Sequence, residues 1–251
     1  MQIVLIGSGN VATVLGRLLK QADHKILQVI SREITHAHIL AAELGATASD
    51  FKTMPDGNAD VVIFTVSDDV LYNNSHHFIM NDKLVLHTAG AASKEILQKF
   101  SSRFGVLYPL QSLKKEMMPT TDIPFLIDGN TEEVTHQVAQ LAFSISNTVS
   151  QASDEKRLVL HTAAVIVNNF TNHLYALAES FCISEKVDFN LLKPLIMETA
   201  KKIQDHSPAQ LQTGPAIRKD IHTLDKHLRL LAAYPKTRTM YLRITDSIMN
   251  P

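Results

Sequence analysis

Short apolar runs alternate with amphipathic stretches over the first 150 residues of the chain. Several runs, among them IVLI, VVIFTV and LVLH, are continuously apolar, which is typical of parallel strands buried on both faces. We expect strands at 2–6, 26–30, 46–48, 60–66, 83–87, 105–108, 125–127 and 148–150. The stretches between them predict helices at 10–21, 34–44, 69–80, 93–100 and 131–146. This alternation predicts right-handed crossovers and a doubly wound, mostly parallel sheet.

The pattern changes after residue 150. From there on we find no strand pattern, only long helical periods at 153–182, 189–206, 217–234 and 237–249. The sequence therefore predicts two domains: an α/β domain of the doubly wound class at 1–150, and an all-helical domain at 151–251.

Composition and charge exclude several classes of protein. Hydrophobic residues make up 45% and charged residues 20% of 251 residues, which excludes a disordered chain. The formal net charge of −1 offers no basic surplus, so we expect no nucleic-acid partner. No basic leader precedes the first apolar run, and no apolar stretch is long enough for a membrane span, so we expect a cytoplasmic protein without a membrane partner.

The chain has a single cysteine, Cys182, which excludes an internal disulfide and a multi-cysteine metal site. Its neighbours are apolar, so we interpret Cys182 as a buried structural thiol rather than a reactive one, and we expect no metal cofactor.

A glycine-rich segment, GSGNVA, follows the first predicted strand and opens the first predicted helix. In this context Gly7 permits a tight turn, and Gly9 lets the backbone approach a pyrophosphate. The helix N-terminus adds free N–H groups and a partial positive charge. We therefore expect the cofactor to be bound at Gly7, Ser8, Gly9, Asn10 and Val11. A glycine turn with a purely structural role is the alternative.

The end of the second predicted strand indicates which dinucleotide is bound. A site that prefers NAD places Asp or Glu there, about 20 residues beyond the loop, on the ribose 2′-hydroxyl. This chain has Ser31 and Arg32 instead, and its first acid, Glu33, comes one position late. Ser31 and Arg32 can bind a 2′-phosphate, which a carboxylate would repel. The sequence therefore predicts that the cofactor is NADP. The alternative is that Arg32 is a solvated charge at the end of the strand and does not contact the cofactor.

Ligands of such sheets bind at the carboxyl ends of the strands. This rule adds two groups of small residues to the cofactor site, Thr65-Val66-Ser67 and Thr88-Ala89, which leave room for a nicotinamide ring. It also points to the segment 108–111. His87 is a possible catalytic acid, although a histidine with a structural hydrogen bond is the more common situation.

The helical stretch 153–182 is mostly apolar, so its polar residues are informative. At about 100° per residue, Arg157, His161, Asn168, Asn172 and Tyr175 share a narrow stripe. A stripe of this kind indicates a wet cleft, because burying unpaired polar groups costs about 1–3 kcal/mol each. We expect His161 to donate a proton and Asn168 to orient the substrate. The alternative is packing against partner helices through structural hydrogen bonds.

A second polar group follows the turn Thr213-Gly214-Pro215. This turn predicts a helix start that attracts anions, with Arg218 within reach as a clamp for an anionic substrate group. A plain capped amphipathic helix is the alternative.

These residues together resemble a known family. The N-terminal part resembles the deazaflavin-dependent NADP oxidoreductases, which are kin to the 6-phosphogluconate dehydrogenase-like and pyrroline-5-carboxylate reductase-like enzymes. The second half is similar to the helical domain of an uncharacterised Rossmann-like family, through Lys156, His161–Val165, Asn168, Thr213–Asp220 and His227. One departure concerns the dehydrogenases, which pair a lysine with an asparagine four residues later; here Lys156 is followed at that spacing by Leu160.

The resemblance implies an NADPH-binding protein with a helical domain for dimerisation and substrate binding. We expect a reductase that transfers hydride between NADP(H) and a small carbonyl, imine or flavin-like acceptor. A non-catalytic NADP sensor on the same fold is the alternative. The apolar segments VLHTAAVIV and LRLLAAY exceed what one helical domain can hide, so we expect a homodimer formed through 151–251.

Overall fold

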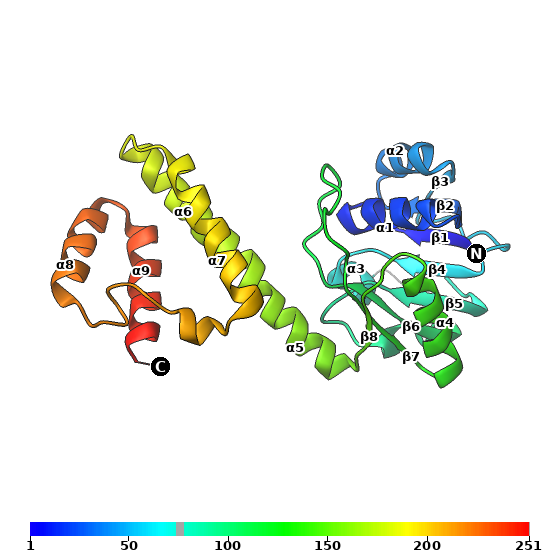
Figure 1. Ribbon diagram of the computed structural model, residues 1–251. Helices are drawn as coiled ribbons and strands as arrows, with labels where there is room; N and C mark the ends of the chain where they lie inside the picture. Colours follow the sequence, from blue (N-terminus) through cyan, green and yellow to red (C-terminus); the bar gives the residue numbers. More distant parts are fainter. Residues whose placement is uncertain (74–77, 251) are drawn as a thin grey trace. The chain divides into compact units, whose positions relative to one another are not determined.

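The computed structural model describes residues 1–73 and 78–250, and it divides into two compact units, Met1–Ile166 and Val167–Pro251 (Figure 1). Each unit is described by itself. The strands end at Gln151, near the predicted boundary, but the first unit extends through the following helix.

The first unit is built on a single eight-stranded sheet in the order β3-β2-β1-β4-β5-β6-β7-β8. Every neighbouring pair is parallel except β6 and β7, which are antiparallel. The strands are β1 (Gln2–Ile6), β2 (Lys25–Ser31), β3 (Thr47–Asp50), β4 (Val61–Phe64), β5 (Asn81–His87), β6 (Ser101–Pro109), β7 (Phe125–Gly129) and β8 (Val149–Gln151). The predicted doubly wound, mostly parallel sheet is confirmed, and its first six strands have the order of dinucleotide-binding folds.

The helices of this unit cover the two faces of the sheet. They are α1 (Asn10–Gln21), α2 (Ile34–Leu44), α3 (Asp68–Asn73), α4 (Glu132–Phe143), α5 (Asp154–Ala164) and the 3₁₀ turn η1 (Lys94–Leu97). Apolar side chains of α1, α2 and α4 form one core with the sheet. Side chains of α3 and η1 form a second core on alternate strand positions. Both faces are therefore buried, as continuously apolar strands require.

Two predicted helices of the first unit are represented only by short helical segments in the structure. Of the helix predicted at 69–80, the structure has α3, which ends at Asn73. Residues 74–77 lie outside the described part of the chain, and residues 78–80 are not helical. Phe78 and Met80 are instead buried in the second core. The prediction for 93–100 is wrong beyond one 3₁₀ turn, because residues 98–100 form a turn that leads into β6, and the Phe100 carbonyl accepts a hydrogen bond from the Met80 amide at 2.8 Å.

The second unit contains helices only, within the part of the chain that the structure describes, which confirms the predicted all-helical class. Its main helices are α6 (Thr171–Ser184), α7 (Lys193–Asp205), α8 (Ile221–Leu230) and α9 (Pro235–Met249), joined by the short turns η3 (Phe189–Leu192), η4 (Pro208–Leu211) and η5 (Leu231–Ala233).

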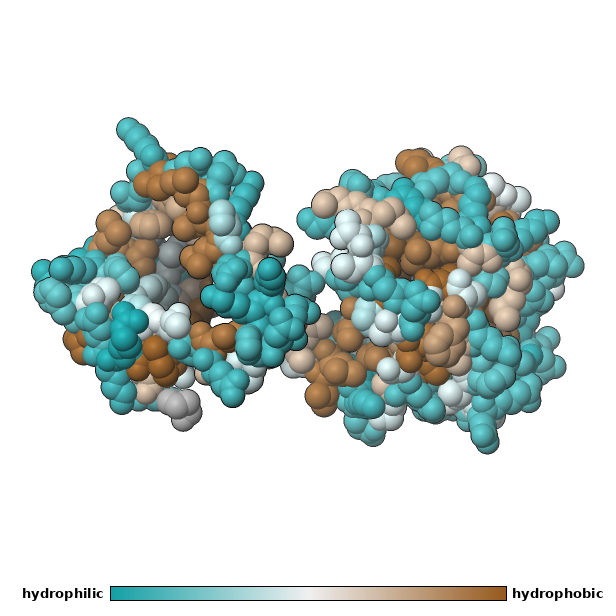
Figure 2. All heavy atoms as spheres, viewed as in Figure 1, coloured by the Kyte–Doolittle hydropathy of each residue, from teal (hydrophilic) through white to brown (hydrophobic). Residues whose placement is uncertain are grey.

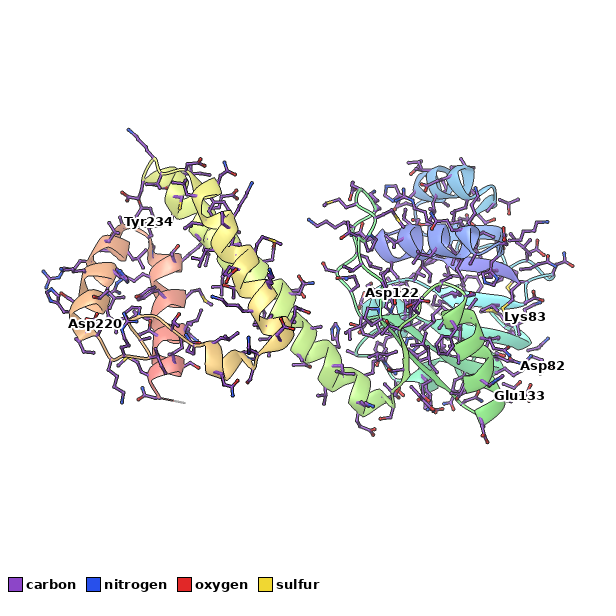
Figure 3. All side chains as sticks on the ribbon, in the orientation of Figure 1. Asp82, Lys83, Asp122, Glu133, Asp220 and Tyr234 are labelled. Atoms are coloured by element: carbon purple, nitrogen blue, oxygen red, sulfur yellow. The ribbon has the colours of Figure 1, made fainter. Side chains whose placement is uncertain are left out.

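The sequence patterns missed two local features of the helices. The predicted helix 153–182 is interrupted by a π-helix, η2 (Val165–Phe170), which lies between α5 and α6. The predicted helix at 217–234 begins only at Ile221, because Asp220 caps it by accepting a hydrogen bond from the Thr223 amide at 3.0 Å (Figure 3). Lys219, just before this cap, has a positive φ of 55°, which interrupts the helical path.

The second unit buries little of its own apolar surface. Four of its hydrophobic side chains are buried among the described residues: Cys182, Ala216, Leu224 and Leu231. Many large ones are exposed on α6 to α9, and hydrophobic surface gathers over these helices in Figure 2. No helix of the described residues is both long and apolar enough to cross a membrane.

Candidate functional site

The glycine loop is held tightly between three strands. Gly7 has a φ of 126°, and a Cβ atom added there would lie 2.5 Å from the Thr65 hydroxyl and 2.6 Å from the Thr65 carbonyl oxygen. The Gly7 amide donates to the Ile30 carbonyl at 2.7 Å, and the Thr65 amide donates to the Ile6 carbonyl at 2.7 Å. Position 7 therefore strongly favours glycine, on grounds of both conformation and space.

The next turn of the loop opens into a cavity. A Cβ atom added to Gly9 would meet nothing within 4 Å, and Gly9 directly precedes α1. Ala12 is buried against the sheet, so the helix lies close to the strands. The cavity has a volume of about 600 Å³ and is lined from four parts of the chain: Gly7, Ser8, Gly9, Thr13 and Arg17; Ser31, Arg32, Glu33, His36, Ile39, Leu40, Glu43 and Phe51; Thr65, Val66, Ser67 and Val70; Lys115 and Glu116. An elongated ligand with phosphates fits this lining and the free N–H groups of α1.

The end of β2 faces the glycine loop. The hydroxyls of Ser8 and Ser31 are 2.7 Å apart, so the loop and the strand end form one wall of the cavity. Arg32 and His36 line the same wall; Arg32 lies just before α2, and His36 lies in its first turn. Sequence reasoning named Ser31 and Arg32 but not His36.

Two basic residues at the rim of the cavity were also missed. Arg17 on α1 forms an ion pair with Glu43 and donates to the Lys115 carbonyl at 2.7 Å. The Lys115 amide donates in turn to the Asn10 side chain at 3.2 Å. Asn10 therefore fixes the segment around Lys115 rather than lining the cavity. No local pattern in the sequence connects Lys115 with Arg17, because 98 residues separate them.

The carboxyl ends of β1, β4, β5 and β6 meet at one edge of the sheet. Ile6 pairs with Phe64, Phe64 with His87, and His87 with Val106, so the residues that follow lie side by side. Thr65, Val66 and Ser67 line the cavity, whereas Thr88 and Ala89 are buried beside it and do not. Val11 also lies outside the lining.

A tyrosine and a histidine are paired at the same edge. The Tyr108 hydroxyl, at the end of β6, lies 2.8 Å from Nδ1 of His161 on α5, and the two rings meet edge to face. A Cβ atom added to Gly90, just beyond β5, would lie 2.6 Å from Nδ1 of His161. The imidazole is half-buried against the backbone of Gly90. Sequence reasoning named His161 and the segment containing Tyr108, but not their contact.

A buried arginine lies one helical turn before His161 on α5. Arg157 is 1% exposed; it donates to the Ala92 carbonyl and, at 2.8 Å, to Asp154. Ser93 and the Lys94 amide also donate to Asp154. The polar stripe predicted along 153–182 is therefore not uniformly a cleft lining, since the Arg157 side chain is buried and forms an ion pair with the partly exposed Asp154.

His87 does not suit the catalytic role considered for it. Its side chain is fully buried, and its Nδ1 accepts a hydrogen bond from the Ala89 amide at 3.1 Å. Burial, with a further contribution from Arg157, lowers the pKa of His87 to about 4. The imidazole is neutral at neutral pH and buried, so it is a poor proton donor to a substrate at the cavity.

The other two predicted catalytic residues belong to the second unit. Asn168 lies in the π-helix η2, which changes the helical phase, so the periodic argument linking it to His161 does not extend across this segment. Arg218 is exposed in the turn before α8. The predicted anion site there is wrong in one respect: the helix N-terminus next to Arg218 is already capped by the Asp220 carboxylate.

Comparisons with known proteins identify the family to which the chain belongs. A model described as "NADP oxidoreductase coenzyme F420-dependent" matches residues 2–89, and one described as a domain of unknown function, DUF2520, matches residues 123–248. A Bacteroides fragilis protein that carries the provisional name NADP oxidoreductase is 33% identical, with a TM-score of 0.89, covering 100% of this chain and 98% of its own. The chain belongs to the DUF2520 family. The match at 2–89 and this relative place it among the NADP-dependent oxidoreductases.

More distant structures share the fold. A pyrroline-5-carboxylate reductase from Streptococcus pyogenes is 14% identical with a TM-score of 0.65, covering 100% of this chain and 99% of its own. An imine reductase from Streptomyces aurantiacus is 11% identical with a TM-score of 0.65, covering 99% and 96%. No curated protein matches the sequence.

Proposed function

We propose that this protein is an NADPH-dependent reductase of a small C=N or C=O compound, with His161 as the proton donor. The observation that carries the proposal is the placement of His161. It packs on Gly90 beside the carboxyl ends of β5 and β6, and the same edge of the sheet supplies Gly7 and Thr65 to the nucleotide cavity. A hydride donor bound in the cavity and a titratable imidazole would then act on one substrate.

The cavity fits NADPH. Gly9 leaves space for the pyrophosphate, and Ser31, Arg32 and His36 offer a hydroxyl and basic groups to the 2′-phosphate. Glu33 also lines this region, but it lies one residue past the position at which a carboxylate reads the ribose of NAD. When bound, the nucleotide supplies the hydride from its nicotinamide ring.

The protein then supplies position and a proton. The imidazolium of His161 would protonate the substrate atom that gains negative charge as the neighbouring carbon is reduced. An imine nitrogen and a carbonyl oxygen both take up a proton when the neighbouring carbon is reduced, so either group suits this donor. Fold relatives named as pyrroline-5-carboxylate and imine reductases support imines as the first substrates to test. Asn168 and Arg218 remain hypotheses for orienting the substrate and for clamping an anionic group.

We also propose a homodimer formed mainly through the helical unit. Four buried hydrophobic side chains are too few to stabilise some 80 residues alone. An apolar hollow of about 540 Å³ lies between α6, α8 and α9, lined by residues such as Leu177, Phe181, Leu231 and Met240. A second copy of this unit would cover such surface at an interface of ordinary size.

The test is NADPH oxidation with stereospecifically deuterated cofactor across three groups of acceptors: cyclic imines, keto acids with and without amines, and an oxidised deazaflavin. We expect transfer of one deuterium from a single face to an imine, and loss of at least about 100-fold in turnover in His161→Gln with unchanged NADPH affinity. If only the deazaflavin were reduced, the proposal of a C=N or C=O substrate would be wrong. Tight NADPH binding without any turnover would favour the alternative of a non-catalytic sensor.

A further inference from the structure

We propose that Tyr108 is the positioning residue of His161: it holds Nδ1, so that Nε2 is the nitrogen that exchanges a proton with the substrate. The inference rests on the proposed function, but it also makes a statement about the resting protein that needs no substrate.

The contacts of the imidazole distinguish its two nitrogens. Nδ1 lies 2.8 Å from the Tyr108 hydroxyl. The Cβ position of Gly90 lies 2.6, 2.7 and 3.1 Å from Nδ1, Cγ and Cε1 of His161, so this side of the ring rests on the backbone. Nε2 has no hydrogen-bond partner among residues 1–73 and 78–250, and the residue is partly exposed. Nε2 is therefore the ring nitrogen open to a substrate.

Tyr108 is held more firmly than the histidine it contacts. It lies in β6, where it pairs with Leu126 of β7, and it is buried in a small core with Val106, Leu126 and Ala152. Leu160, the residue before His161, packs against the same core. The hydroxyl thus has a position fixed by the sheet, and α5 is anchored next to it.

The electrostatic surroundings keep the phenol protonated. Burial raises the pKa of Tyr108, Arg157 opposes this in part, and Asp68 adds to it. A neutral hydroxyl carries two acceptor lone pairs and one hydrogen that rotates, so it can accept a hydrogen bond from Nδ1–H. Among the described residues it is the only acceptor placed at Nδ1.

This contact determines how a proton can move. For Nε2 to release a proton and take it back, the neutral ring must carry its hydrogen on Nδ1. In the step proposed, the Nε2–H bond of the imidazolium breaks and the proton joins the substrate's nitrogen or oxygen. The ring is left neutral with Nδ1–H bonded to the Tyr108 oxygen, and a solvent proton then restores Nε2–H.

The first measurement is the tautomer of His161, by NMR of the full chain with ¹⁵N-labelled histidine, assigned through His161→Gln. We expect the neutral ring of the wild type to carry its hydrogen on Nδ1, and Tyr108→Phe to lose this preference. The matched control is Tyr241→Phe, which removes an equivalent hydroxyl 2.8 Å from Nδ1 of His227 in the other unit. A wild-type ring with its hydrogen on Nε2 would overturn the proposal, whether or not Tyr108→Phe folds.

The second measurement uses whichever acceptor the wild type reduces. Tyr108→Phe should lower kcat by about tenfold or more and displace the pH profile, with KM and NADPH affinity changed less than about twofold, because the hydroxyl acts on the donor and not on binding. An unchanged kcat and pH profile would overturn the proposal even if the enzyme is a reductase. An absence of turnover with every acceptor would instead count against the proposed function, and the tautomer would still decide the role of Tyr108.

Discussion

Gly90 and His161 fit against each other so closely that one methyl group at position 90 would overlap the imidazole: its carbon would lie 2.6 Å from Nδ1 and 2.7 Å from Cγ. The two residues come from different parts of the chain: Gly90 lies in the segment after β5, and His161 lies in the last turn of α5. The position of the His161 ring therefore depends on the absence of a side chain at Gly90. Gly90 does not have a positive φ, so its backbone conformation alone does not require glycine.

Gly90→Ala should displace the His161 ring from its position against the backbone of residue 90. We expect turnover to fall by about tenfold or more, with a modest cost in stability of about 1–3 kcal/mol from overpacking. The matched control is Gly57→Ala, because a Cβ atom there meets nothing within 4 Å. Steady-state kinetics and urea unfolding of both variants provide the check. Wild-type turnover in Gly90→Ala would mean that the position of His161 does not matter for the reaction.

The sequence was sufficient to predict the features that depend on a local pattern of residues, namely the strands, the glycine loop and helix α1. Short runs typical of strands, several of them continuously apolar, predicted all eight strands, and the glycine segment predicted the loop after β1, because both are encoded within about ten consecutive residues. The order of the first six strands then follows from the general rule for such folds. Helix α1 was predicted with the bounds that the structure has, Asn10–Gln21.

Contacts between distant segments could not be predicted in this way. Tyr108 and His161 are 53 residues apart, and no periodicity of one element indicates a partner on another. The π-helix at Val165–Phe170 also escaped, since its side-chain composition is that of an ordinary apolar helix. The polar stripe therefore mixed a buried ion pair, at Arg157, with a half-exposed imidazole, at His161.

Arg32 should determine the preference for the phosphorylated cofactor. Arg32→Glu is expected to weaken NADPH binding by about 2 kcal/mol or more, through a lost charge-assisted contact and added repulsion, while NADH binding changes little. Lys25→Glu is the matched control, because Lys25 is exposed at the opposite end of the same strand. Titration calorimetry with both nucleotides measures the effect. Equal losses for NADPH and NADH would show that Arg32 does not contact the 2′-phosphate.

Substitutions at the two glycines of the loop should affect different properties: nucleotide binding at Gly9 and stability at Gly7. Gly9→Val is expected to abolish binding of either nucleotide and leave the fold intact, since its side chain would extend into the open cavity. Gly7→Ala should instead destabilise the protein by about 1–3 kcal/mol, because position 7 combines a φ of 126° with close contact to Thr65. Thermal unfolding and nucleotide binding, measured on both variants, separate the two effects. Micromolar binding by Gly9→Val would contradict the assignment of the pyrophosphate.

His87 should make stability depend on pH. Its pKa is about 4 in the folded protein, against an ordinary value of 6.5, because of burial and the nearby Arg157. Above pH 6.5 the imidazole is neutral in both states. Between pH 6.5 and 4 the unfolded chain binds more protons, so the free energy of unfolding falls as the pH falls, by up to about 1.4 kcal/mol per pH unit.

His87→Gln removes this titration. Urea unfolding at pH 7.5, 5.5 and 4.5 should show a flatter dependence in the variant than in the wild type. Asp154, whose pKa is held below its ordinary value by Ser93 and Arg157 in spite of partial burial, loses its contribution only at lower pH. Parallel curves for wild type and His87→Gln over pH 6.5 to 4 would show that the buried imidazole is not the group responsible.

The exposed apolar surface of the helical unit should be the dimer interface. Leu195 on α7 is 64% exposed, and Phe143 at the end of α4 in the other unit is 59% exposed, so the two give matched substitutions. We expect the wild type to sediment as a dimer at micromolar concentration, Leu195→Glu to shift it toward monomer, and Phe143→Glu to leave it dimeric. A charge buried in an apolar interface without a partner is strongly unfavourable, whereas one on open surface costs little. A monomeric wild type, or equal dissociation by both variants, would contradict an interface formed through the apolar surface of the helical unit.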